Sequence, residues 1–173
     1  MTFLTNLFRP RPDQREALRP LWHRVVELSR EPELYRDDGV ADSVAGRFDM
    51  IAAVLALVLL RMERDQATGA HASLLTELFV ADMDGQLRET GVGDLMVGKH
   101  IGRLMSVLGG RLGALREALA QPGSTTLEAA LARNVTMAED GRGTVALACR
   151  LRAFHERLGD LDSEALLAGR FAL

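Results

Sequence analysis

The sequence predicts an all-α fold: a single compact multi-helix domain with a buried central helix and αα-hairpins. Its 173 residues are 47% hydrophobic and 26% charged, which is the composition of an ordinary folded domain. Apolar residues recur at three- and four-residue steps, whereas alternating runs typical of strands are missing and aromatic residues make up only 5%. Prolines, which break helices, lie before residue 33 except for Pro122. We therefore expect a helical domain over residues 13–173, preceded by a separate segment, 1–12, that is flexible or lies at a membrane interface.

The first expected helix runs from Pro20 to Arg30 and is ended by Pro32. The next segment has an apolar residue at three- and four-residue steps, and its remaining faces are apolar too. The members of this stripe are Val44, Phe48, Ile51, Leu55, Leu59 and Met62. A helix that is apolar all round is usually buried by its neighbours, so this one is expected at the centre of the fold.

An αα-hairpin should follow. One helix begins near Ser73, and Gly91 suits the position after its last turn. Asp94 suits the N-cap of a second helix that ends near Leu119. The apolar stripe of that second helix comprises Val97, Ile101, Leu104, Leu108, Leu112, Leu115 and Leu119.

Glycines accompany this stripe along one flank, at Gly98, Gly102, Gly109 and Gly113. Each costs up to about 1 kcal/mol relative to alanine inside a helix. This predicts that another element approaches the flank closely, with a helix of the same chain favoured over a helix of a partner.

The C-terminal part contains three further helices. Thr125 and Glu128 form a capping-box pattern at the start of the first. The second carries Leu147, Leu151, Phe154 and Leu158, and Ser163 begins a short final helix.

Composition excludes several classes of protein. The formal net charge of −3 and pI near 5.8 argue against a dedicated nucleic-acid binder. Cys149 is the only cysteine, so it has no partner for an internal disulfide and no metal-ligand spacing. The longest apolar run, Met50 to Leu60, has 11 residues and is too short to span a membrane. Neither a secretory signal nor a membrane span is expected, and we predict a cytoplasmic protein.

Catalytic and cofactor motifs are weak. Gly93 to Lys99 matches the glycine and lysine spacing of a P-loop, but His100 stands where serine or threonine belongs, and the segment follows a helix instead of a strand. Asp82 and Asp84 would point about 200° apart on a helix and cannot chelate one ion together. We expect no metal, no cofactor and no enzymatic activity.

The first residues place four apolar side chains along one helical side, followed by two arginines before any acid. This pattern is typical of an interfacial anchor that contacts a membrane with anionic headgroups. A frayed tail or a strip that packs on the domain remains an equal alternative. The candidate membrane contacts are Phe3, Leu4, Leu7, Phe8, Arg9 and Arg11.

Two groups of segments together are more specific than any of these motifs. They are Gly39-Val40-Ala41-Asp42-Ser43 with Gly46-Arg47-Phe48-Asp49-Met50, and Asp82-Met83-Asp84 with Leu87-Arg88-Glu89, Gly91-Val92-Gly93-Asp94-Leu95 and Val97-Gly98-Lys99. They resemble the ubiquinol-cytochrome c chaperone family, over roughly Leu21 to Val135. Ala41 and Thr136 depart from its usual proline and aromatic residue.

The resemblance implies a non-enzymatic, all-helical assembly factor of the cytochrome bc complex. It implies binding of newly made cytochrome b by a protein peripherally associated with the inner membrane. The motif residues, which would bind the client or fix the helices, are Arg47, Phe48, Asp49, Asp82, Asp84, Arg88, Gly91, Gly93, Asp94 and Lys99. The alternative is a lipid- or isoprenoid-binding peripheral membrane protein with a pocket between the central helix and the glycine flank. The oligomeric state is left open.

Overall fold

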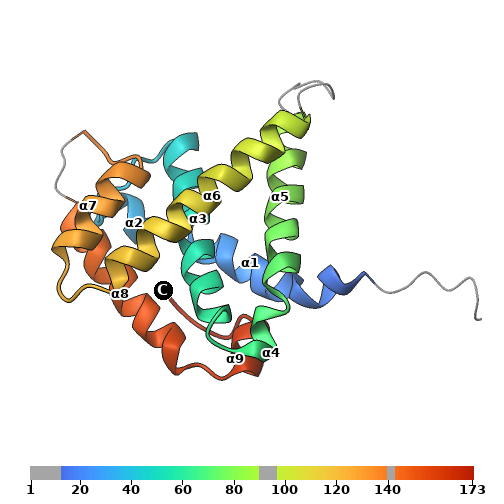
Figure 1. Ribbon diagram of the computed structural model, residues 1–173. Coiled ribbons are helices and arrows are strands. Elements are labelled where there is room, and N and C mark those ends of the chain that lie inside the picture. The colour runs from blue at the N-terminus through green and yellow to red at the C-terminus, as the bar shows by residue number, and fades with distance from the viewer. Residues whose placement is uncertain (1–12, 90–96, 140–142) are drawn as a thin grey trace, which may run out of the picture.

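A computed structural model describes residues 13–89, 97–139 and 143–173 (Figure 1). The expected membrane contacts in segment 1–12 lie outside the described residues, as do Gly91, Gly93 and Asp94. Within the described part the chain forms helices and no strand, and only one isolated β-bridge, Val40 to Met137, is present. The all-α prediction is therefore confirmed.

The elements follow one another in the order predicted, with a few short additions. They are the 3₁₀ helix η1 (Gln14–Leu18) and the α-helices α1 (Arg19–Leu28), α2 (Pro32–Arg36), α3 (Val44–Met62), α4 (Gln66–Gly69), α5 (Ala72–Glu89), α6 (Val97–Leu119), α7 (Thr125–Asn134), α8 (Thr144–Asp160) and α9 (Ser163–Leu167). Figure 1 shows α6 crossing in front of α3, while the end of α5 meets the beginning of α6 far from the C-terminal helices.

Helix α3 is the centre of the fold, as its all-round apolar sequence predicts. Every residue from Met50 to Met62 is buried, and α1, α6 and α8 pack against the helix. Ser43 caps its start, because the hydroxyl oxygen accepts a hydrogen bond of 3.1 Å from the N–H of Gly46. At its other end, the guanidinium of Arg61 donates to the carbonyls of Leu158 (2.9 Å) and Leu161 (2.6 Å), which ties α3 to the end of α8.

Two local predictions were wrong. Helix α1 ends at Leu28, and Pro32 does not simply terminate a helix but is the first residue of α2, where its missing N–H has no cost. The N-cap of α7 is Ser124, without a side-chain cap, so Thr125 and Glu128 form no capping box.

The glycine flank of α6 also differs from the prediction. A Cβ atom built on Gly102, Gly109 or Gly113 meets no atom of the described residues within 4 Å. No helix of this part of the chain therefore approaches that flank, because the buried side of α6 is formed by Leu104, Leu108 and Leu115 on the opposite face. None of the described helices is long and apolar enough to cross a membrane.

Candidate functional site

The motif residue Asp49 lies inside the fold and joins three elements. Its side chain on α3 is 10% exposed, and one carboxylate oxygen accepts a hydrogen bond from Arg111 of α6. The other oxygen accepts the backbone N–H of Thr136 at 2.8 Å and the Thr136 hydroxyl at 2.6 Å. Asp49 thus holds α6 and the segment after α7 against the central helix.

The two residues before Asp49 point elsewhere, because successive side chains on a helix are about 100° apart. Arg47 is exposed and binds Asp42 at 2.7 Å. Phe48 is half-buried and packs against Phe79 of α5, with a centroid distance of 6.2 Å. The Arg111 guanidinium lies over the Phe48 ring, 5.4 Å from its centre, and also holds the ring in place.

An apolar hollow of about 670 Å³ opens beside Phe48, and we name it the α3–α5 groove. Its apolar walls come from three helices, and among the described residues two arginines but no carboxylate take part in its lining. The lining residues are Arg30, Val44, Ala45, Arg47, Phe48, Ile51, Met83, Gln86 and Leu104. Val44, the first residue of α3, is 89% exposed and is the most exposed of the large apolar side chains described. This groove is suited to binding an apolar segment.

A second hollow, the α5–α6 groove, has a volume of about 590 Å³. It lies between α5 and α6 and is lined by other residues of these helices than the α3–α5 groove. Its lining residues are Arg15, Ser73, Thr76, Glu77, Val80, Ala81, Asp84, Ile101 and Met105. The motif residue Asp84 belongs to this groove. The exposed motif residue Asp82 lines a neighbouring hollow of about 580 Å³, which shares Arg15 and Ala81 with it.

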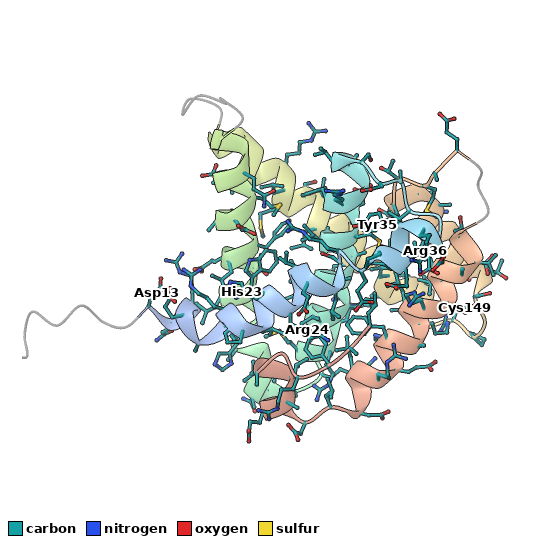
Figure 2. The ribbon with its side chains drawn as sticks, turned by 180° about the vertical axis from the view of Figure 1, so that it is seen from behind. Asp13, His23, Arg24, Tyr35, Arg36 and Cys149 are labelled. Atoms are coloured by element: carbon teal, nitrogen blue, oxygen red, sulfur yellow. The ribbon has the colours of Figure 1, made fainter. Side chains whose placement is uncertain are left out.

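A more polar hollow adjoins the α3–α5 groove and shares Arg30 and Arg47 with it. Tyr35 and Arg36 line this hollow, and both are labelled in Figure 2, which shows the molecule from behind relative to Figure 1. The Tyr35 hydroxyl donates to the carbonyl of Ser29 at 2.6 Å, and burial raises the pKa of Tyr35. The tyrosine therefore stays neutral and acts as a structural hydrogen-bond donor.

Chemical groups typical of catalysis do not converge within the described residues. No cluster of three or more potential metal-ligating side chains is found there. Cys149 is exposed on α8 (Figure 2), and its thiol forms no disulfide. The Nε2 atom of His155 lies 2.7 Å from the guanidinium of Arg64, and burial, followed by the charge of Arg64, lowers the pKa of His155.

Comparison with known proteins then decides the family. Residues 36–173 match the ubiquinol-cytochrome C chaperone family. The chain belongs to this family. The match covers α3 to α9 and therefore extends beyond Val135, where the motif resemblance ends. Membership supports a role as an assembly chaperone of the cytochrome bc complex.

A solved structure supports the same assignment. The chain is similar to the crystal structure of the Cbp3 homolog from Brucella abortus, with a TM-score of 0.79 and 28% sequence identity. The alignment covers 98% of this chain and 96% of that one. The curated proteins include no match.

Within this chaperone, the structure distributes the motif residues over different places. Asp49 is in the core, Arg47 and Phe48 are at the α3–α5 groove, and Asp82 and Asp84 are on the other side of α5. Arg88 and Lys99 belong to α5 and α6, but their side chains are outside the described part. The motif is therefore not one continuous surface.

Sequence reasoning missed Arg111 and treated Thr136 only as a departure from the family pattern. A signal for Arg111 existed, because its spacing from Leu104, Leu108 and Leu115 places this charged residue on the buried face of α6. A buried arginine requires acceptors for its guanidinium, either a carboxylate or, as at Arg61, backbone carbonyls. No local pattern indicates that the partner is Asp49, which is 62 positions away.

Proposed function

We propose that this chaperone binds newly made cytochrome b and that the α3–α5 groove receives an apolar segment of it. The observation that carries this proposal is the apolar groove beside the motif residues Arg47 and Phe48, with the 89% exposed Val44 in its lining. A newly made membrane protein exposes apolar side chains until it is assembled, and a chaperone must cover them reversibly.

The chemistry of the groove suits this task. Covering one leucine or phenylalanine side chain contributes about 1.5–3 kcal/mol, so a few such contacts give a complex that can later dissociate. Arg30 and Arg47 at the rim would attract carboxylates or lipid phosphates that flank an apolar client segment. No carboxylate is found among the described lining residues, which avoids repulsion of such groups.

Val44→Asp is a direct test of the groove. Val44 is exposed at the first position of α3, where an acidic residue suits the helix dipole, so folding should be unaffected. The matched control is Val145→Asp, because Val145 is 55% exposed at the second position of α8 and lines neither groove.

Both variants should replace the parent protein in cells. We expect Val44→Asp, at normal abundance, to capture less cytochrome b from native membranes and to lower the assembled cytochrome bc complex. Val145→Asp should behave as the parent. Equal capture and equal complex levels for the two variants would refute the groove assignment.

We further propose that the chaperone associates peripherally with the membrane through Phe3, Leu4, Leu7, Phe8, Arg9 and Arg11. The support is the amphipathic order of these residues, four apolar side chains followed by two cations. Removal of residues 2–11 should lower sedimentation with vesicles containing phosphatidylglycerol without lowering the melting temperature. Unchanged sedimentation would contradict this proposal.

A lipid- or isoprenoid-binding protein is the second candidate. The observation that favours it is the combination of an apolar hollow of about 670 Å³ with two arginines at its rim, which suits an acyl chain with an anionic head. This hollow is on the buried side of α6, not on the predicted glycine flank. Native mass spectrometry of protein purified from membranes should reveal a bound amphiphile, and bare protein would count against this candidate.

A further inference from the structure

We propose that the apolar side of residues 1–8 docks into the α5–α6 groove of the same chain. This inference concerns a different groove from the one assigned to the client and does not depend on cytochrome b binding. The N-terminal segment would then have two binding sites, the membrane and the α5–α6 groove. These two sites compete for the same apolar side chains of the segment.

The α5–α6 groove offers apolar walls with carboxylates beside them. Val80 and Ala81 of α5 face Ile101 and Met105 of α6 across it, and Met105 is 44% exposed despite its size. Glu77 and Asp84 are also part of the lining. Because Arg15 is the one cation beside these two carboxylates in the described lining, the lining has a net negative charge. An occupant that matches this groove has an apolar side and positive charges.

The N-terminal segment has this composition. Phe3, Leu4, Leu7 and Phe8 share one side of a helix, and Arg9 and Arg11 follow without any acidic residue. The prolines at positions 10 and 12 exclude continuation of that helix and favour an extended connection. The arginines would then lie between the apolar residues and the body of the protein, within reach of carboxylates at the groove.

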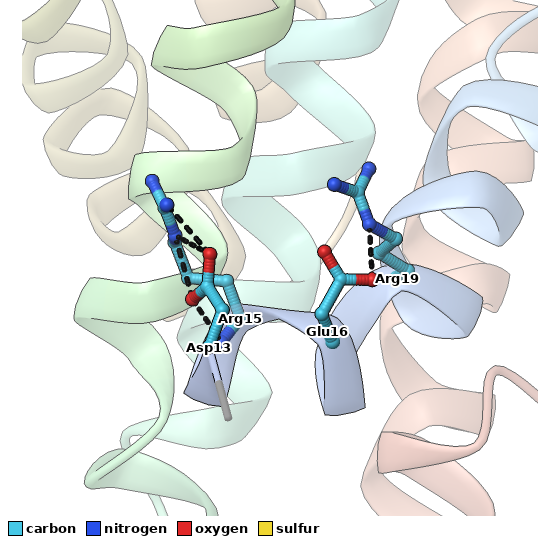
Figure 3. A network of polar contacts seen from close by, with 4 residues as sticks. All are labelled: Asp13, Arg15, Glu16 and Arg19. Atoms are coloured by element: carbon cyan, nitrogen blue, oxygen red, sulfur yellow. Dashed lines mark hydrogen bonds and ion pairs between the residues drawn. The ribbon is translucent and has the colours of Figure 1, made fainter. Parts of the chain in front are cut away.

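The chain enters the described fold at the edge of this groove. Arg15, which lines it, binds the carboxylate of Asp13 through its side chain (2.6–3.0 Å) and through its backbone N–H (3.0 Å), as Figure 3 shows. These bonds lower the pKa of Asp13 to about 2, so the contact persists at neutral pH. The η1 helix that carries Arg15 also packs on α5. The start of the fold is therefore fixed beside the groove.

The tether is long enough and favours the intramolecular contact. Phe8 is five residues before Asp13, a span of up to about 17 Å when extended. A short flexible connection gives an effective concentration on the order of 1 mM. A second copy of the chain would have to exceed this concentration to compete. The tether and the charge complementarity together favour the chain's own segment as the occupant.

The test is the labelling rate of a cysteine in the groove. Met105→Cys is introduced together with Cys149→Ser, which removes the single natural thiol, and the full chain is reacted with a small uncharged maleimide without vesicles. The rate is then compared with that of the same protein carrying Leu4→Asp and Leu7→Asp. Val145→Cys, also exposed but on α8, is the matched control site.

We expect the two aspartates to accelerate labelling at position 105 several-fold, because an effective concentration on the order of 1 mM lets even a weak contact cover the groove for most of the time. Arg9→Glu with Arg11→Glu should also accelerate it, and labelling at position 145 should stay constant. Equal rates at position 105 with and without the aspartates would overturn the proposal. Protection that increases with protein concentration would also overturn it, because the occupant would then be a second copy. Vesicle binding is measured separately, so its outcome distinguishes the membrane proposal from this one.

Discussion

Asp49→Asn tests whether this motif residue stabilises the fold. The substitution keeps the shape of the side chain but leaves Arg111 without its anionic partner beneath Phe48. Removing one partner of a buried ion pair costs about 3–5 kcal/mol. We therefore expect a loss of roughly 3 kcal/mol in the free energy of unfolding, near the lower limit because the amide can still accept from Thr136. For a chain of this size, that corresponds to a decrease of about 6–12 °C in melting temperature.

Urea unfolding of a double-mutant cycle measures this contribution. Arg111→Met alone should also destabilise the fold. The double variant, Asp49→Asn with Arg111→Met, should lose at least about 1 kcal/mol less free energy of unfolding than the sum of the two single losses, because it has no unpaired buried charge. The matched control is Asp42→Asn, which breaks the exposed contact with Arg47 and should cost less than about 1 kcal/mol. Additive losses within about 0.5 kcal/mol in the cycle would refute the reasoning.

Three further predictions concern close packing and pH. Gly46→Ala should destabilise by about 1–3 kcal/mol, because its Cβ would lie 2.0 Å from the carbonyl oxygen of Ala41; an unchanged melting temperature would contradict this. Gly109→Ala should instead stabilise by up to about 1 kcal/mol, since its Cβ meets no described atom and helix propensity improves; destabilisation would indicate an unseen contact. The lowered pKa of His155 favours its neutral form in the folded state. Its contribution to the free energy of unfolding is therefore present above the ordinary pKa of 6.5 and is lost as the pH falls below 6.5. Urea unfolding is therefore measured at several pH values from 7.5 to 5. The free energy of unfolding of the parent should decrease more over this range than that of His155→Gln, and equal decreases would contradict this.

The sequence predicted most of the helices because their apolar periodicity is strong. The apolar stripe from Val44 to Met62 lies on the central helix α3, and the short final helix begins at Ser163 as expected. These segments bury a continuous face or all faces, so their pattern contains the necessary information. The start of α2 at Pro32 was missed because proline both ends helices and begins them, and only the neighbouring backbone decides between the two.

The glycine flank shows why tertiary neighbours are harder to predict. Glycine permits close approach of another helix but does not specify one, and the flank is open in the described part of the chain. The candidate site has the same limitation. Phe48 and Met83 were both in recognised motifs, yet nothing local indicates that α3 and α5 bring them to one groove. Long-range placement of this kind depends on packing between elements that are distant in sequence.

The triplet Arg47, Phe48 and Asp49 explains how one short motif contains residues with different tasks. Because each side chain is turned by about 100° from the last, the three reach the groove rim, the groove wall and the core in succession. A variant of Asp49 would lower complex assembly through a lower abundance of folded chaperone. A variant of Val44, one turn earlier on the same helix, would lower it at normal abundance. Measuring abundance together with client capture therefore separates residues that support the groove from residues that bind within it.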